Sequence, residues 1–228
     1  DEDQQMAILT VKEGQPVIDN YVWQHEDHDL HSNDELVIYE LLVRDFSGGE
    51  ADPYPRGKLK HITEKLDYLS DLGINAIELM PIQTFPGHEG WGYNTQHYFA
   101  VEPSYGTSQD LKKLIDECHG SGIRVILDLL INHSERDSPL TQIDYDYWYR
   151  REPKDPDFNW GPEFDYNHYD ETLDVYPARQ FYRDIVEFWI KEYHIDGFRF
   201  DAVKQMGHFE FLRELTKLTA QKAQPKPF

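Results

Sequence analysis

The sequence predicts an α/β fold in which parallel strands are covered by helices, and three observations lead to that prediction. Apolar runs of strand length alternate four times with segments whose apolar residues recur at helical spacing. The strand-like runs are too uniformly apolar to keep one face in water, which is typical of a parallel sheet with helices outside it. Neither an internal repeat nor a low-complexity tract interrupts this order in the 228 residues.

The first strand–helix unit follows an N-terminal arm. An apolar run over residues 36–43 predicts a strand, and a polar loop with glycine and proline follows at 47–57. Gly73 closes the next helix as a C-cap residue. That helix is marked by leucine and isoleucine at helical spacing, at Leu59, Ile62, Leu66, Leu69 and Leu72.

The second unit begins with the apolar run 74–82 and a loop rich in glycine, histidine and aromatic residues. Thr107 or Ser108 can cap the second helix, which stops at the glycines of 120–122. The third strand is predicted over 123–131, and an acidic insertion separates it from its helix.

The third helix and the fourth unit complete the series. The third helix is marked by Phe181, Ile185, Phe188 and Trp189. The fourth strand is predicted over 197–203, and its helix is marked by Phe209, Leu212, Leu215 and Leu218.

Charge divides the chain into an arm, an insertion and a nearly balanced remainder. The formal net charge is −21, from 43 acidic and 22 basic side chains. Residues 1–35 hold ten acids and one base, and residues 134–177 hold twelve acids and four bases. Both segments can be solvated surface, or the insertion can line a cleft or hold a cation. In the arm, 6–11 alternates weakly and 21–23 could form a short strand.

The same composition limits the partners. An acidic protein repels phosphates, so neither nucleic acid nor an anionic membrane is expected, and a neutral substrate is permitted. No apolar run is long enough to span a membrane, and the single cysteine, Cys118, excludes an internal disulfide. The sequence leaves the cellular location open, with a secreted or periplasmic one slightly favoured.

Polar residues follow the predicted strands at their C-terminal ends. In a parallel barrel these ends meet on one face, so the side chains become neighbours there. A doubly wound open sheet is the rival architecture, but 47–49 lacks the spacing of a phosphate-binding loop. The polar residues at the strand ends are Trp91, Tyr93, Asn94 and His97, then Asp128, Asn132 and His133, then Arg199, Asp201 and Lys204.

The stretch GFRFDAVK at 197–204 carries the most information. Period-2 alternation places Arg199, Asp201 and Val203 on one face of the fourth strand. A guanidinium two residues away is expected to keep the Asp201 carboxylate ionised, as a glycosidase nucleophile must be. Taken alone, the pair could equally be structural.

Two further stretches favour a catalytic role for the Arg199–Asp201 pair over a structural one. LDLLINHS at 127–134, together with 197–204, closely resembles two signature stretches of the α-amylase superfamily of glycoside hydrolases. WGYNTQHYFA at 91–100 and SYGT at 104–107 are similar to a third. The resemblance covers about residues 36–224. It implies a (β/α)8 TIM barrel of which 36–228 is the N-terminal half, with four βα units and 134–177 as the small second domain after strand three.

Roles then follow from the resemblance. Asp201 would be the catalytic nucleophile, which Arg199 orients, and His133 would bind a hydroxyl of the sugar being cleaved. Tyr93 would stack on that sugar, with Trp91 beside it in the same substrate-binding stretch, and Lys204 would reach the next sugar on the leaving-group side. The resemblance makes Asp128 a structural aspartate.

It also raises the question of a metal. Asn132 looks like a ligand of the calcium found in many members, so no cofactor is required and a structural calcium is an open alternative. Gln205 stands where many members have histidine, and Asp155, Asp157, Glu163 and Asp165 match no defined calcium loop. Ten aromatic residues of the insertion, among them Trp148, Trp160 and Tyr166, can form a small core or stack on sugars.

The resemblance also shows what the chain lacks. The family's general-acid glutamate after strand five and its His-Asp pair after strand seven have no counterpart, and Glu210 and Glu214 lie on the predicted outer helix. We therefore expect a fragment of a retaining hydrolase of α-glucans or maltooligosaccharides that is inactive alone. We also expect it to be completed by the missing half of the barrel or by self-association. A glucan-branching or other transglycosylating enzyme, or a non-catalytic binding or transporter subunit, are the alternatives.

Overall fold

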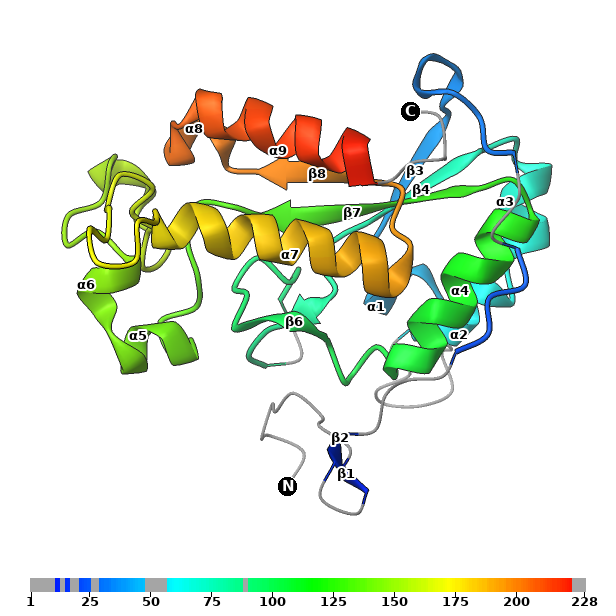
Figure 1. The fold of residues 1–228 in the computed structure, drawn as a ribbon. Coiled ribbons are helices and arrows are strands. Elements are labelled where there is room, and N and C mark those ends of the chain that lie inside the picture. The colour runs from blue at the N-terminus through cyan, green and yellow to red at the C-terminus, as the bar shows by residue number, and fades with distance from the viewer. Residues whose placement is uncertain are drawn as a thin grey trace.

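A computed structural model describes residues 11–12, 15–16, 21–25, 29–47, 57–87 and 90–222 of the 228-residue chain. Its centre is a four-stranded parallel sheet in the order β3-β4-β7-β8 (Figure 1). The strands are β3 (Ile38–Leu41), β4 (Ala76–Leu79), β7 (Arg124–Leu130) and β8 (Gly197–Asp201). The predicted parallel α/β fold is thus confirmed, and each strand is shorter than the apolar run that predicted it.

Helices follow each strand in the predicted order. The unit after β3 holds α1 (Val43–Phe46), α2 (Leu59–Thr63) and α3 (Leu66–Asp71), and the later units hold α4 (Ser108–Gly120), α7 (Pro177–Tyr193) and α9 (Phe209–Lys222). Thr107 caps α4 by accepting a hydrogen bond from the Asp110 N–H. Gly73 follows α3 with φ of +83°, a left-handed conformation that glycine adopts without strain.

The predicted first helix is wrong in one respect. It is broken into α2 and α3 at Lys65, whose φ of −113° and ψ of 11° lie outside the helical region. Leu59, Ile62, Leu66 and Leu69 are still buried, so the apolar face predicted from the spacing is retained across the break, whereas Leu72 is exposed.

The predicted fourth strand is also too long. β8 ends at Asp201, Ala202 takes the left-handed conformation with φ of +55°, and α8 (Val203–Met206) begins at once. Val203 and Lys204 therefore lie on a helix and do not share the strand face of Arg199. Alternation alone could not detect this turn, since the left-handed residue is an alanine.

Segment 134–177 connects β7 to α7 and lies toward the end of the sheet to which the β7 and β8 arrows point (Figure 1). It contains α5 (Pro139–Ile143), α6 (Tyr145–Trp148) and the 3-10 turn η2 (Pro156–Phe158). Tyr149, Phe164 and Tyr166 are at most 2% exposed, and they pack with Tyr182 of α7 in one aromatic cluster. Three of the ten aromatics of the insertion therefore belong to a core, whereas Phe158, Trp160, Tyr169 and Tyr176 are exposed.

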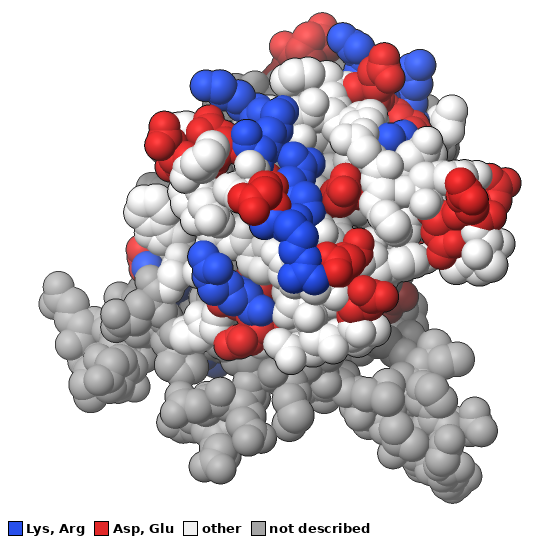
Figure 2. Space-filling model, turned by 90° about the vertical axis from the view of Figure 1, so that its left-hand side faces the viewer, with Lys and Arg blue, Asp and Glu red and all other residues white. Residues whose placement is uncertain are grey.

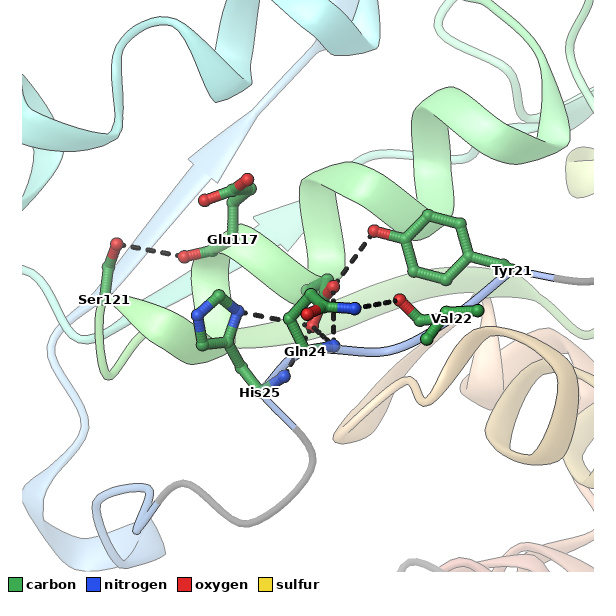
Figure 3. Close-up of polar contacts among 7 residues, drawn as sticks. Tyr21, Val22, Gln24, His25, Glu117 and Ser121 are labelled. Atoms are coloured by element: carbon green, nitrogen blue, oxygen red, sulfur yellow. Dashed lines mark hydrogen bonds and ion pairs between the residues drawn. The ribbon is translucent and has the colours of Figure 1, made fainter.

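The small remaining strands form two antiparallel pairs, β1 (Val11–Lys12) with β2 (Gln15–Pro16) and β5 (Gln83–Thr84) with β6 (His97–Val101). The strand expected at 21–23 is wrong, since these residues have no regular structure and lie against α4 instead (Figure 3). The alternation expected at 6–11 falls almost wholly outside the described residues.

The sheet has two open edges within the part of the chain that the structure describes, at β3 and at β8. Beside β8 lies a hollow lined mainly by apolar side chains, including Leu36, Phe198 and Phe200. The open edges agree with the expectation for half a barrel, and what covers them stays a prediction. No helix in the described ranges is long and apolar enough to cross a membrane.

Candidate active site

The C-terminal ends of β7 and β8 bring three charged residues into contact. Asp128 and Arg199 are register partners on the two neighbouring strands. The Arg199 Nη1 atom donates to both carboxylate oxygens of Asp128, at 3.0 and 2.9 Å, and to Asp201 Oδ1 at 2.6 Å. One guanidinium nitrogen therefore joins a buried carboxylate to an accessible one.

The two carboxylates differ in environment. Asp128 is fully buried, which raises its pKa above the usual range although Tyr93 and Arg199 both favour the charged form. Asp201 is only partly buried, with 29% of its side chain exposed. An oriented and accessible carboxylate beside a cation has the properties of a nucleophile.

Tyr93, on the loop after β4, is the fourth residue of this hydrogen-bonded group. Its hydroxyl donates to Asp128 Oδ2 at 2.5 Å, and burial together with that carboxylate raises the tyrosine pKa. Gly92 makes the approach possible, since a Cβ there would lie 2.6 Å from the Pro81 carbonyl oxygen and φ is +92°. The absence of a side chain at Gly92 thus allows the loop to pack against the chain just after β4.

His133 lies after β7 and is only 3% exposed. Burial lowers its pKa to about 4, and the nearby Asp201 charge opposes that effect only in part. The ring is therefore neutral at pH 7. Its Nδ1 atom is buried and has no hydrogen-bond partner among the described residues.

Sequence reasoning missed how the chain segment that carries Asn132 and His133 is held. Three tyrosine hydroxyls donate to consecutive or nearby carbonyls: Tyr182 to Leu130 at 3.0 Å, Tyr166 to Ile131 at 2.5 Å and Tyr98 to His133 at 2.9 Å. These tyrosines come from α7, the insertion and β6, so only the tertiary fold brings them together. The insertion thus supports the site as well as flanking it.

The other predicted residues lie around this group. Trp91 is 63% exposed and lines a small hollow with Phe85 and Tyr93. Lys204 is exposed on α8, so its side chain leaves from a helix and not from the strand face. Figure 2 looks onto the side to which the β7 and β8 arrows of Figure 1 point, and Lys and Arg side chains form a row across it despite the net charge of −21.

A second feature missed by sequence reasoning is an acidic group on the sheet. Glu40 and Glu78 are register partners on β3 and β4, and their carboxylate oxygens lie within 4.8 Å of each other and of Asp128. Burial and the charges of Asp128 and Glu40 raise the pKa of Glu78. The signal was present in the sequence, because one glutamate interrupts each of two apolar runs.

The surroundings of Asn132 offer one carboxylate, that of Glu163, to the expected calcium. Asn132 is 2% exposed, and the neighbouring Glu163, which forms a β-bridge with His133, accepts from the Lys154 N–H at 2.9 Å. Arg150 Nε lies 3.7 Å from the same carboxylate. Calcium takes about six to eight oxygen ligands. The Arg150 guanidinium thus lies beside this carboxylate, and the acids of the insertion form no cluster of three within the described residues.

A parallel sheet with helices outside it and charged side chains gathered at the strand ends is the arrangement typical of parallel-barrel enzymes. Residues 38–185 match the family described as alpha amylase, catalytic domain. The chain belongs to the α-amylase superfamily of glycoside hydrolases.

Three similar proteins illustrate the relationship. The malto-oligosyltrehalose trehalohydrolase of Saccharolobus solfataricus is 36% identical over 184 residues, which are 81% of this chain and 30% of that protein. A 1,4-alpha-glucan branching enzyme of Pseudoalteromonas atlantica is 36% identical over 195 residues, 84% of this chain and 26% of that protein. The structure of pullulanase type I from Bacillus subtilis complexed with maltose superposes with a TM-score of 0.78 at 27% identity, covering 94% of this chain and 34% of that one. The chain spans about a third or less of the length of each.

Proposed function

We propose that this chain contributes the nucleophile side of an active site for retaining hydrolysis of α-glucans. The observation that carries the proposal is the Arg199 Nη1 atom between buried Asp128 and accessible Asp201. Asp201 attacks the anomeric carbon and forms a glycosyl ester, and the leaving oxygen takes a proton from a general acid.

The neighbouring side chains have distinct roles. Arg199 fixes the direction of the Asp201 carboxylate, and Asp128 holds Arg199 from the other side. Neutral His133 stands beside the nucleophile without adding a positive charge that would oppose an oxocarbenium-like transition state. Tyr93, tied to Asp128, presents its partly exposed ring to the sugar.

The substrate class rests on the relatives. The similar proteins include a trehalohydrolase, a branching enzyme and a pullulanase complexed with maltose, and all three names refer to α-linked glucose polymers or oligomers. We infer that maltooligosaccharides bind here. Calorimetric titration of the chain with maltohexaose tests this. We expect saturable binding that His133→Ala weakens. A titration of the parent chain that gives no heat of binding contradicts the proposal.

Transglycosylation is the second candidate, because the branching enzyme is as similar to this chain as the trehalohydrolase is. In a protein that joins this chain to a general acid, hydrolysis of amylose increases the number of reducing ends. Branching leaves that number unchanged and creates new branch points. The assembled Arg199–Asp201 pair supports either enzyme over a non-catalytic binding subunit.

The chain alone is proposed to bind glucans without cleaving them. Retaining hydrolysis needs a second carboxyl group as general acid. Asp128 cannot supply the proton, since it is fully buried and bonded by Tyr93 and Arg199, and Glu214 on α9 is paired with Arg183. A reducing-sugar assay with soluble starch is expected to stay at background, and reducing ends formed by the purified chain contradict this.

We also propose that the site works without calcium. Arg150 supplies the positive charge at Glu163, so a chelator is expected to change neither the melting temperature nor the maltohexaose affinity. A fall in melting temperature that added calcium reverses contradicts the proposal.

A further inference from the structure

We propose that the exposed indole ring of Trp160, backed by Phe158, is a stacking platform for a glucose unit next to His133. The inference rests on the proposed function and extends it to a sugar-binding surface within the insertion. The two aromatic rings are 5.4 Å apart in an edge-to-face arrangement, and the Trp160 ring is 5.7 Å from the His133 ring.

Trp160 is the most exposed aromatic side chain of segment 134–177, ahead of Tyr169 at 41% and Tyr176 at 36%. Tyr149, Phe164 and Tyr166 are at most 2% exposed and form the core, whereas Trp160 is 48% exposed and Phe158 is 36% exposed. Leaving half of an indole in water gives up much of the stabilisation that its burial would bring. The ring is thus available to a ligand that has an apolar face.

The loop that carries Trp160 is fixed against the site. The Ser134 N–H donates to the Pro162 carbonyl at 3.1 Å, and Glu163 forms a β-bridge with His133. Gly161 is required by this contact, because a Cβ there would lie 2.3 Å from the Ser134 oxygen and 3.0 Å from His133 Cδ2. The indole is therefore positioned before any ligand arrives.

The exposures show which group a sugar would meet. His133 is 3% exposed and offers little surface, while the neighbouring Trp160 ring offers a broad one. A pyranose has an apolar C–H face and a polar rim, so it stacks on an aromatic ring while its hydroxyls bond to polar neighbours. Trp160 thus supplies contact area for the sugar beside His133, the residue to which the sequence analysis assigned a sugar hydroxyl.

Titration with maltohexaose tests the platform, followed by calorimetry and by tryptophan fluorescence. Trp160→Ala is expected to raise the dissociation constant about tenfold. Trp160→Phe keeps a ring and is expected to recover most of the affinity, while the fluorescence change on binding becomes smaller in both variants. Tyr68→Ala is the matched control, because Tyr68 is 53% exposed on α3 and lies outside the site.

The outcomes separate this inference from the proposed function. If the parent chain binds and Trp160→Ala binds equally well, the platform is wrong and the proposed function stands. If the parent chain does not bind maltohexaose, the proposed function fails and the platform fails with it. Thermal melting of each variant shows whether the fold is retained, and equal losses in Trp160→Ala and Trp160→Phe with unchanged melting also overturn stacking.

Discussion

Asp128 is fully buried, and a single nitrogen of Arg199 bonds both of its carboxylate oxygens. The two residues are register partners on β7 and β8, so the ion pair links the strands at the end where Asp201 stands. The contact serves stability and chemistry together, because the same Nη1 atom also holds Asp201. Loss of Arg199 is therefore expected to affect both.

Arg199→Leu leaves Asp128 buried without its counter-ion. Removing one partner of a buried pair costs about 3 kcal/mol or more, and the 42% exposure of Arg199 places the expected loss of unfolding free energy at about 2–3 kcal/mol. Urea unfolding followed by circular dichroism measures it. Adding Asp128→Asn to Arg199→Leu is expected to restore part of the loss, because no uncompensated charge is then buried. A double variant as unstable as the sum of the single ones contradicts this explanation.

The low pKa of His133 predicts an acid-sensitive step in stability. In the unfolded chain the imidazole titrates at 6.5, whereas burial holds it neutral in the folded chain down to about 4. As the pH falls from 6.5 to about 4 the unfolded state gains a proton that the folded state does not, so stability decreases by about 3 kcal/mol at most. Unfolding measured across that range in the parent and in His133→Gln checks it. The unfolding free energy of the parent minus that of His133→Gln must fall as the pH drops from 6.5 to about 4 if the prediction holds.

Glu78 is expected to destabilise the folded state of the chain at neutral pH. Its pKa is raised by burial and by the charges of Asp128 and Glu40, so the folded state holds a proton that the unfolded state releases more easily. Stability is then lost as the pH rises through the folded pKa. Glu78→Gln removes the charge and keeps the shape, so its melting temperature should exceed that of the parent at pH 8 and match it more closely at pH 4. An equal difference at both pH values rules out the electrostatic cause.

Much of the framework was accessible from the sequence because the apolar runs are continuous. The four strands, their parallel order and the helices at Thr107, Pro177 and Phe209 follow from patterns that local physics enforces. The contact of Asp201 with Arg199 was expected from alternation along one strand, and the structure places Asp128 on the far side of the same guanidinium.

The remainder depends on contacts between distant segments. No local pattern shows that Tyr98, Tyr166 and Tyr182 donate to the backbone around Asn132, since they lie in three different elements. The left-handed Ala202 ended β8 earlier than alternation predicted and moved Lys204 onto a helix. The attachment of residues 21–25 was missed for the same reason, because its partner, Asp116, lies about ninety residues further along the chain.

Asp116 of α4 anchors the N-terminal segment 21–25, and Figure 3 shows this segment running beside the helix that carries Glu117 and Ser121. Its carboxylate accepts from the Gln24 N–H at 3.0 Å, the His25 N–H at 2.9 Å and the Tyr21 hydroxyl at 3.0 Å. Trp23 adds a stacked contact with His194, at 3.9 Å between ring centroids. Three donors on one buried carboxylate make Asp116 the main attachment.

Asp116→Ala is therefore expected to release this segment while leaving the sheet intact. Burial tends to raise the Asp116 pKa, but the N–H groups of Gln24 and His25 and the Tyr21 hydroxyl lower it further than burial raises it. A lowered carboxyl pKa means that the attachment is strongest above that pKa and weakens as the pH falls through it. Hydrogen exchange should show protection of the Gln24 and His25 amides falling at least tenfold, or about 1.4 kcal/mol, in Asp116→Ala, with the amides of β7 unchanged. Equal protection of Gln24 and His25 in the variant and the parent would mean that the stacking of Trp23 on His194 holds the segment instead.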